Sequence, residues 1–146
     1  NLMKPHRAYF GQKDYQQSVV IRRLVADLNL NLEIIVMSTV REPDGLAMSS
    51  RNARLTPDQR RVAPVLYRSL RRSEEQIKGG ERNATIILEG MREMIEADPL
   101  AQIDYLALCD PDTLKAVDRI EGPTLAAVAV RFGHTRLIDN ILIAAP

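Results

Sequence analysis

The most constraining feature of the sequence is a strand–helix–strand pattern in its first 37 residues. Residues 6–10 mix aromatic and polar side chains and stop at Gly11, which indicates the end of a strand. Valine and leucine then recur at spacings of three and four from Val19 to Leu28, as in a helix with one apolar face. Residues 32–37 are an almost continuous apolar run, typical of strands in parallel sheets. The pattern predicts a right-handed βαβ unit, and because two parallel strands do not make a stable sheet, it predicts further strands upstream.

A long loop separates this unit from the rest of the chain. Residues 38–55 follow neither a helical nor a strand period, and connections of that length are often functional. Pro43, Asp44 and Gly45 indicate a turn within the loop. We therefore expect a domain boundary near residue 40.

Two helices are predicted after the loop. Thr56 and Gln59 have the spacing of a capping box at the start of the first helix, which we expect to kink at Pro64 and to end at residues 79–80. The second helix is predicted from about residue 83 to residue 97.

Three strands complete the predicted fold. They lie near residues 103–109, 125–131 and 136–143, and the last two are joined through a hairpin-like connection at 132–135. A short helix is expected at 112–118. The predicted fold class is thus α/β followed by α+β: a βαβ unit, then a small domain of two helices and a three-stranded antiparallel sheet.

Composition excludes several classes of protein. The longest apolar run is six residues, far short of the roughly 20 that a membrane span needs. One cysteine and two histidines argue against a disulfide framework and a metal site, and we expect a cytoplasmic protein.

Charge is concentrated in the middle of the chain. The net charge is +1, but residues 51–85 hold nine basic and four acidic groups. This segment either faces an anion, such as a nucleotide, or is a solvated helix face. Because aromatic residues make up only 4%, there is little for bases to stack on, and we expect no nucleic-acid binding.

The first candidate site lies where the first strand runs into the first helix. Ligands of α/β proteins bind at the carboxyl ends of strands, and helix N-termini favour phosphate. Gly11 would allow close approach to the backbone, Lys13 would supply a positive charge, and Gln17 lies one turn on from the expected cap, Asp14. The alternative is a tight turn with a solvated lysine.

The second candidate site is Met48, Ser49, Ser50 and Arg51 in the long loop. Two hydroxyl groups and a guanidinium at successive positions can surround a phosphate chain, and Arg41 would add charge. The alternative is an exposed polar loop. If Lys13 and Arg51 converge on one ligand, they form a clamp for charge that develops in phosphoryl or adenylyl transfer.

These stretches closely resemble the pantothenate synthetase (pantoate–β-alanine ligase) family. The resemblance covers nearly the whole chain in order, and it rests on residues 10–17, 41–52, 55–57 and 136–140. It implies a Rossmann-like nucleotidyltransferase fold. Residues 1–39 would be the end of an incomplete ATP- and pantoate-binding domain, and residues 40–146 a C-terminal lid domain.

The resemblance also implies a reaction. The family uses ATP and Mg²⁺ to join pantoate to β-alanine through a pantoyl adenylate, releasing pyrophosphate and AMP. Gln17 would hold pantoate, and the catalytic residues would be Lys13, Ser49, Ser50 and Arg51. The residues implied in ATP binding are Gly11, Gln12, Lys13, Asp14, Val40, Met48, Ser49, Ser50 and Arg51.

The chain departs from the family in one large respect. The family carries a His-x-Gly-His motif in its N-terminal half, and this sequence has none. Because the chain also begins with Asn1, we expect it to lack the N-terminal half and to be inactive alone. The family forms homodimers mainly through that half. The alternative is a non-catalytic module that binds nucleotide weakly or pairs with the other half.

Overall fold

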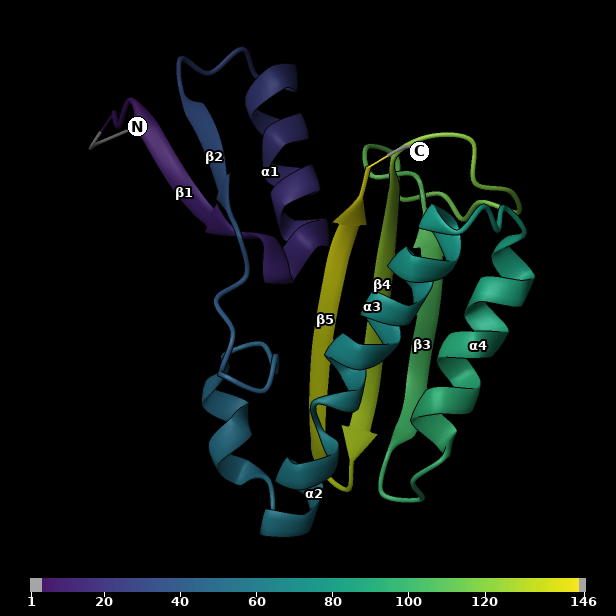
Figure 1. Cartoon of the computed structure of the whole chain (residues 1–146). Helices are drawn as coiled ribbons and strands as arrows, with labels where there is room; N and C mark the ends of the chain where they lie inside the picture. Colours follow the sequence, from purple (N-terminus) through teal and green to yellow (C-terminus); the bar gives the residue numbers. More distant parts are fainter. Residues whose placement is uncertain (1–3, 145–146) are drawn as a thin grey trace. The chain divides into compact units, whose positions relative to one another are not determined.

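The computed structural model describes residues 4–144, so Asn1 lies outside the described residues. The chain divides into two compact units, Asn1–Thr39 and Val40–Pro146 (Figure 1), and each is described by itself.

The first unit is the predicted βαβ unit. Strand β1 (Arg7–Gly11) leads through the 3₁₀ helix η1 (Gln12–Asp14) into helix α1 (Tyr15–Asp27), and strand β2 (Glu33–Met37) follows. The two strands pair in parallel along their whole length. This confirms the predicted α/β start of the chain.

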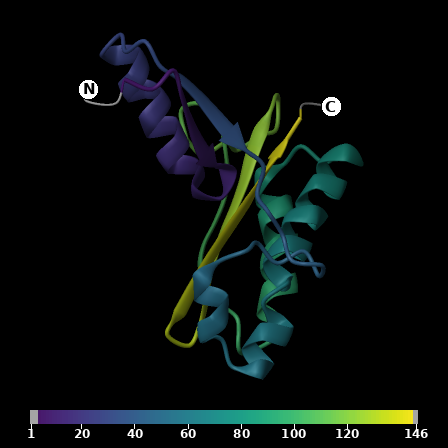
Figure 2. The same ribbon diagram turned by 90° about the vertical axis from the view of Figure 1, so that its left-hand side faces the viewer.

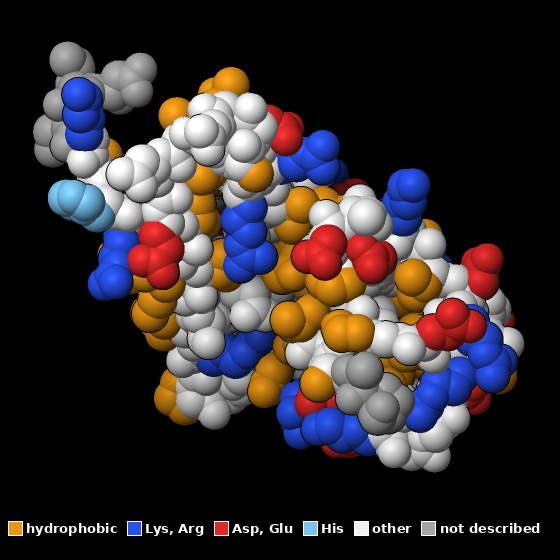
Figure 3. Space-filling model, turned by 90° about the horizontal axis from the view of Figure 1, so that it is seen from above, with side chains coloured by type: hydrophobic (Ala, Val, Ile, Leu, Met, Phe, Trp, Pro, Cys, Tyr) orange, Lys and Arg blue, Asp and Glu red, His pale blue; other side chains and the backbone are white. Residues whose placement is uncertain are grey.

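Much of the apolar surface of the first unit is exposed. In α1, Val20 and Leu24 are 57% and 46% exposed. Leu28, the C-cap of α1, and Tyr9 of β1 are each 60% exposed. Apolar side chains are visible among charged ones on the face in Figure 3. A two-stranded sheet with one helix has too few partners to bury these side chains.

The second unit begins with the long loop, which contains the 3₁₀ helix η2 (Ser50–Arg54). Helix α2 (Pro57–Val62) then starts with the predicted capping box, in which the Thr56 hydroxyl accepts from the Gln59 amide at 3.3 Å and the Gln59 side chain accepts from the Thr56 amide at 3.0 Å.

The prediction of a kinked helix at Pro64 is wrong, because the helix is broken there into two. Helix α2 ends before Ala63, and Pro64 becomes the N-cap of a separate helix, α3 (Val65–Lys78). Proline lacks the N–H group that would continue the ladder, and its ring collides with the carbonyl one turn earlier.

Helix α4 (Ala84–Glu96) and three antiparallel strands complete the unit, confirming the predicted sheet. Strands β3 (Gln102–Cys109), β4 (Thr124–Phe132) and β5 (Thr135–Ile143) are hydrogen-bonded in that order. The turn between β4 and β5 uses Gly133 at a φ of +58°, a left-handed conformation that suits glycine.

The prediction of a short helix at 112–118 is also wrong. The Asp110 carboxylate accepts hydrogen bonds from the Asp112 amide at 3.1 Å and from the Thr113 amide at 2.7 Å, which closes a turn instead. Leu114 then takes a left-handed φ of +58°, which a helix does not allow.

Helices α3 and α4 lie side by side over one face of the three-stranded sheet, as Figures 1 and 2 both show. Their apolar faces and the facing side of the sheet make the core. Its fully buried large side chains include Leu66, Leu70, Ile77, Ile87, Met91, Ile95, Val128, Val130 and Phe132. None of the helices within residues 4–144 is long and apolar enough to cross a membrane.

Candidate functional site

The first group of predicted residues lies at the carboxyl end of β1. Gly11 is the last residue of the strand, and the chain turns at once through η1 into the N-terminus of α1. Gly11 is extended (φ −78°, ψ 136°), and an added Cβ would meet no atom within 4 Å. Any residue can adopt this backbone conformation, so the backbone does not require glycine at this position.

The capping role expected for Asp14 is not seen. Asp14 occupies the N-cap position of α1, but its side chain makes no capping hydrogen bond. Its backbone (φ −94°, ψ 60°) lies outside the extended region that a capping side chain needs, because η1 comes directly before it. Lys13 is half-buried, and Gln17 is exposed in the first turn of α1.

The second group lies on a short hairpin in the loop of the second unit. The amide of Met48 donates to the carbonyl of Val40 at 2.9 Å, and the amide of Glu42 donates to the carbonyl of Leu46 at 2.8 Å. The predicted turn closes the hairpin, with the Gly45 amide donating to the carbonyl of Glu42 at 2.9 Å. Within this polar loop, Leu46 and Ala47 are buried.

Arg41, which we expected to add charge for a ligand, is paired within the second unit. Its guanidinium makes a two-pronged ion pair with Asp139 of β5, with Nη1–Oδ2 at 2.6 Å and Nη2–Oδ1 at 3.0 Å. It also donates to the carbonyl of Gly45 at 3.0 Å and lies 4.0 Å from the centre of the Tyr67 ring in α3. The Asp139 side chain is 1% exposed, so this is a buried charge pair.

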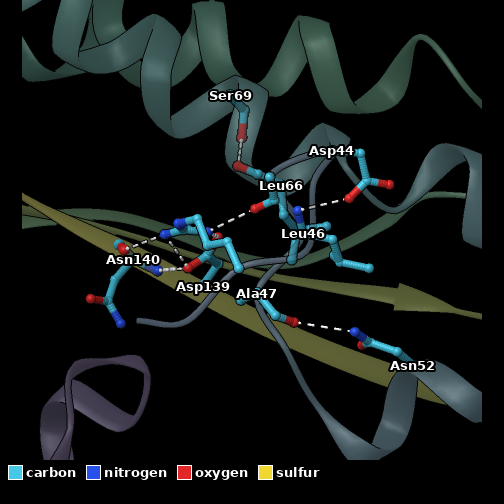
Figure 4. Close-up of polar contacts among 10 residues, drawn as sticks. Asp44, Leu46, Ala47, Asn52, Leu66, Ser69, Asp139 and Asn140 are labelled. Carbon is cyan, nitrogen blue, oxygen red and sulfur yellow. Dashed lines mark hydrogen bonds and ion pairs between the residues drawn. The ribbon is translucent and has the colours of Figure 1, made fainter. Parts of the chain in front are cut away.

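The pair joins the loop to β5, and Figure 4 shows the two β5 residues next to the loop. Asp139 and Asn140, from β5, lie beside the loop segment that carries Leu46 and Ala47. The side-chain amide of Asn52 donates to the carbonyl of Ala47 at 3.2 Å, which fixes the chain beyond the hairpin.

Met48, Ser49, Ser50 and Arg51 follow the hairpin directly. Met48 is 56% exposed, Ser50 and Arg51 are exposed, and Ser49 is half-buried. The Ser49 hydroxyl accepts from the Arg51 amide at 3.2 Å and so caps η2. The segment therefore presents two hydroxyl groups and a guanidinium from a structured loop.

Two carboxylates in the loop share one arginine. Arg60 of α2 contacts Glu42 and Asp44, each at 2.5 Å. Hydrogen bonds from Asn52 and then Arg60 lower the pKa of Glu42, and a hydrogen bond from Arg60 lowers the pKa of Asp44. Hydrogen bonds to the two carboxylates raise the pKa of Arg60. Arg60 thus keeps both carboxylates ionised and offsets one of their two negative charges.

Other titratable groups contribute less. Cys109 is buried at the end of β3, and burial raises the pKa of its thiol, which disfavours a nucleophilic thiolate. Within residues 4–144, no cluster of three or more histidine, cysteine or acidic side chains could hold a metal ion. In the basic segment 51–85, ion pairs are made by Arg60, Arg61, Arg71 and Lys78.

The predicted residues thus fall into two groups. Gly11 to Asp14 and Gln17 lie together in the first unit, and Val40 with Met48 to Arg51 lies in the second. Convergence of Lys13 and Arg51 on one ligand remains a prediction. The sequence analysis did not identify Asp139 and Tyr67 as the partners of Arg41. The only sequence signal for Asp139 was that residues 136–140 belong to the stretches that carry the family resemblance.

A helix N-terminus at the carboxyl end of a parallel strand, and a Ser-Ser-Arg segment with exposed donors, are each typical of α/β proteins that bind phosphate-containing ligands. Comparison with known proteins gives the particular family. The family model described as pantoate-beta-alanine ligase matches residues 1–142. The chain belongs to the pantoate–β-alanine ligase family.

Relatives and solved structures agree with this assignment. The chain is 54% identical to the pantothenate synthetase of Roseiflexus castenholzii over 99% of its own length and 52% of the relative's. It is 57% identical to that of Desulfatibacillum aliphaticivorans, over 96% of the chain and 50% of the relative. The chain therefore spans about half the length of the curated relatives it matches.

Among solved structures, the pantothenate synthetase of Thermus thermophilus matches with a TM-score of 0.93 and 44% identity, over 99% of this chain and 52% of that chain. The pantoate-beta-alanine ligase of Francisella tularensis, complexed with beta-gamma ATP and beta-alanine, matches with a TM-score of 0.64 and 30% identity. That match covers 97% of this chain and 45% of the other.

Gly45→Ala tests how the hairpin is built. Gly45 has a φ of +89°, and an added Cβ would overlap the Tyr67 ring that stacks on Arg41. We expect a loss of unfolding free energy of about 2–4 kcal/mol from backbone strain and overpacking combined. Gly80→Ala is the matched control: its φ is +100° but its Cβ would meet nothing within 4 Å, so it should cost about 1–2 kcal/mol. Equal losses in urea unfolding of the two variants would contradict this account.

Arg60→Met tests the charge balance of the loop. Since the folded-state pKa values of Glu42 and Asp44 are lowered, their ionised forms stabilise the fold at neutral pH, and this stabilisation is lost as the pH falls through those values. We therefore expect the melting temperature of Arg60→Met to fall less between pH 6 and roughly pH 3 than that of the unchanged chain.

Arg61→Met is the control for this prediction, because Arg61 pairs only with the exposed Asp58 among the described ion pairs. It should keep the full acid dependence. If Arg60→Met shows the same fall in melting temperature as Arg61→Met, the carboxylates do not depend on Arg60.

Proposed function

We propose that this chain supplies the C-terminal part of an ATP-dependent ligase that joins pantoate to β-alanine. The observation that carries the proposal is the unbroken run from the end of β1 through Gly11 and η1 into the N-terminus of α1. Such a run directs backbone N–H groups and the positive end of a helix dipole at one point, where a phosphate is stabilised. Lys13 adds a full charge there.

The proposed reaction has two steps. A pantoate carboxylate oxygen bonds to the α-phosphorus of ATP, the bond to the bridging oxygen breaks, and pyrophosphate leaves. The amine of β-alanine then attacks the carbonyl carbon of the pantoyl adenylate and loses a proton, while AMP leaves with the bonding electron pair. The first step brings a carboxylate toward a polyanion, so fixed positive charge should supply much of the acceleration.

Each group of residues has a proposed part in this reaction. Gly11, Gln12, Lys13 and Asp14 would line the ATP site, and Gln17 would hold pantoate through its amide. Met48, Ser49, Ser50 and Arg51 would contact the phosphates as the counterpart of the KMSKS loop of class I aminoacyl-tRNA synthetases, and Val40 would meet the adenine through its backbone. Lys13, Ser49, Ser50 and Arg51 would be the catalytic residues.

Mg²⁺ would enter with ATP. The described residues form no cluster of three or more histidine, cysteine or acidic side chains around a metal. Mg²⁺ is commonly held through substrate phosphates and water, with few protein ligands. The metal would neutralise phosphate charge, and the chain's own cations would orient the complex.

The N-terminal half of the family's chains is the proposed partner of the first unit. The exposed side chains of Tyr9, Val20, Leu24 and Leu28 support this, because a larger sheet with further helices would bury them. In that assembly residues 1–39 would be the last part of a Rossmann-like domain and residues 40–146 a lid that excludes water from the adenylate. Homodimerisation would follow from the N-terminal half.

We also place the reaction in the cytoplasm and assign no nucleic-acid partner. The lone thiol of Cys109 is free and buried, as suits a reducing compartment.

Pantoate-dependent exchange of radiolabelled pyrophosphate into ATP tests the proposal. We expect negligible exchange by this chain alone, since it has no His-x-Gly-His motif, and measurable exchange when the N-terminal half of the Roseiflexus castenholzii relative is added. No exchange with both parts present, despite their association in gel filtration, would favour a non-catalytic module. Strong exchange by the chain alone would contradict the division of the site.

Lys13→Ala in the assembled enzyme tests the charge at the helix N-terminus. Loss of one positioned donor should lower the exchange rate on the order of 100-fold or more. Lys78→Ala is the matched control, because Lys78 pairs with Glu74 on the exposed face of α3. An unchanged rate for Lys13→Ala would remove Lys13 from the mechanism.

A further inference from the structure

The segment that would contact the phosphates is fixed at both of its ends. At one end the Met48 amide donates to the carbonyl of Val40, and at the other the Asn52 side chain donates to the carbonyl of Ala47 at 3.2 Å and to the Glu42 carboxylate at 2.7 Å. Both anchors belong to the same hairpin. The position of Ser49, Ser50 and Arg51 therefore depends on how firmly this hairpin is held.

Arg41 joins the hairpin to two other elements of its unit. Its guanidinium bonds the carbonyl of Gly45 at the hairpin turn, the Asp139 carboxylate twice and the carbonyl of Asn140 at 3.4 Å. Its face lies 4.0 Å from the centre of the Tyr67 ring. One side chain thus joins the loop, β5 and α3, and a planar five-donor group is needed to do so.

We propose that Arg41 is a positioning residue for ATP, acting through the hairpin and not by contact with the nucleotide. The inference rests on the proposed function. With Arg41 in place, the Ser49 and Ser50 hydroxyls and the Arg51 guanidinium are presented in one arrangement before ATP binds. Without it, ATP has to order the segment on binding, which weakens binding and misplaces the donors.

A purely stabilising role for Arg41 predicts different kinetics. Destabilisation of the unit would lower the amount of folded enzyme, which reduces kcat per total protein and leaves both Michaelis constants unchanged. A positioning role raises the KM for ATP and lowers kcat, while the KM for pantoate stays the same, since Gln17 lies in the other unit.

The kinetic experiment compares variants in the enzyme assembled from this chain and the N-terminal half of the Roseiflexus castenholzii relative. We expect Arg41→Met to raise the KM for ATP on the order of 10-fold and to leave the KM for pantoate within about twofold. Arg41→Lys should not rescue it, because an ammonium group keeps the charge but cannot bridge the same acceptors. Full rescue by lysine, or an unchanged KM for ATP, would overturn the proposal.

Ile95→Ala is the control for stability. Ile95 is fully buried in α4 and belongs to the core, and its truncation should lower the melting temperature without touching the hairpin. Both variants are assayed below their melting temperatures, and the control should keep both Michaelis constants. A raised KM for ATP in Ile95→Ala would show that loss of stability alone causes the effect.

Hydrogen–deuterium exchange of this chain tests the role of Arg41 in the hairpin independently of the proposed function. Arg41→Met should speed exchange at the amides of Glu42, Gly45, Leu46 and Met48 on the order of 10-fold more than Ile95→Ala does, because the hairpin would open more often. Unchanged protection would overturn the positioning role whatever the kinetics. If Arg41→Met loses protection but the assembly with the unchanged chain catalyses no pyrophosphate exchange, the proposed function is contradicted while the role of Arg41 in the hairpin stands.

Discussion

The ion pair between Arg41 and Asp139 is the interaction on which the arrangement of the long loop depends. It joins Arg41 in the loop to Asp139 in β5, two residues that lie 98 positions apart in the sequence. The side chain of Asp139 is 1% exposed. A buried charge is costly unless every strong acceptor and donor is matched, and here both carboxylate oxygens meet the guanidinium. The Asn140 amide adds a further hydrogen bond to Asp139 Oδ1 at 2.8 Å.

The same pair explains why a polar, irregular loop has a defined structure. The hairpin has only a few backbone hydrogen bonds of its own, and Leu46 beneath it is buried in the core. Two sets of ion pairs hold it: Arg41 of the hairpin pairs with Asp139 of β5, and Arg60 of α2 pairs with Glu42 and Asp44. In the proposed ligase, the loop would therefore move with the second unit as one piece, and closure over ATP would be a motion of the unit.

Local patterns in the sequence predicted most of the fold, but they could not predict contacts between residues that are far apart in the sequence. The apolar run at 32–37 and the capping box at Thr56 act over a few residues, so the βαβ unit and the start of α2 were predictable. Pro64 was recognised as a disruption, but whether a proline kinks or breaks a helix depends on the packing around it. Arg41 was assigned to the ligand because no local pattern reveals a carboxylate on β5 as its partner.

A double-mutant cycle on Arg41 and Asp139 tests whether their ion pair holds the loop. Urea unfolding would give the free energy for Arg41→Met, Asp139→Asn and the two combined. We expect each single variant to lose about 3–5 kcal/mol, because each leaves a buried polar group unmatched, and the combined variant to lose clearly less than the sum. Additive losses would mean that the two side chains do not stabilise each other, and the ion pair could then not be what holds the loop.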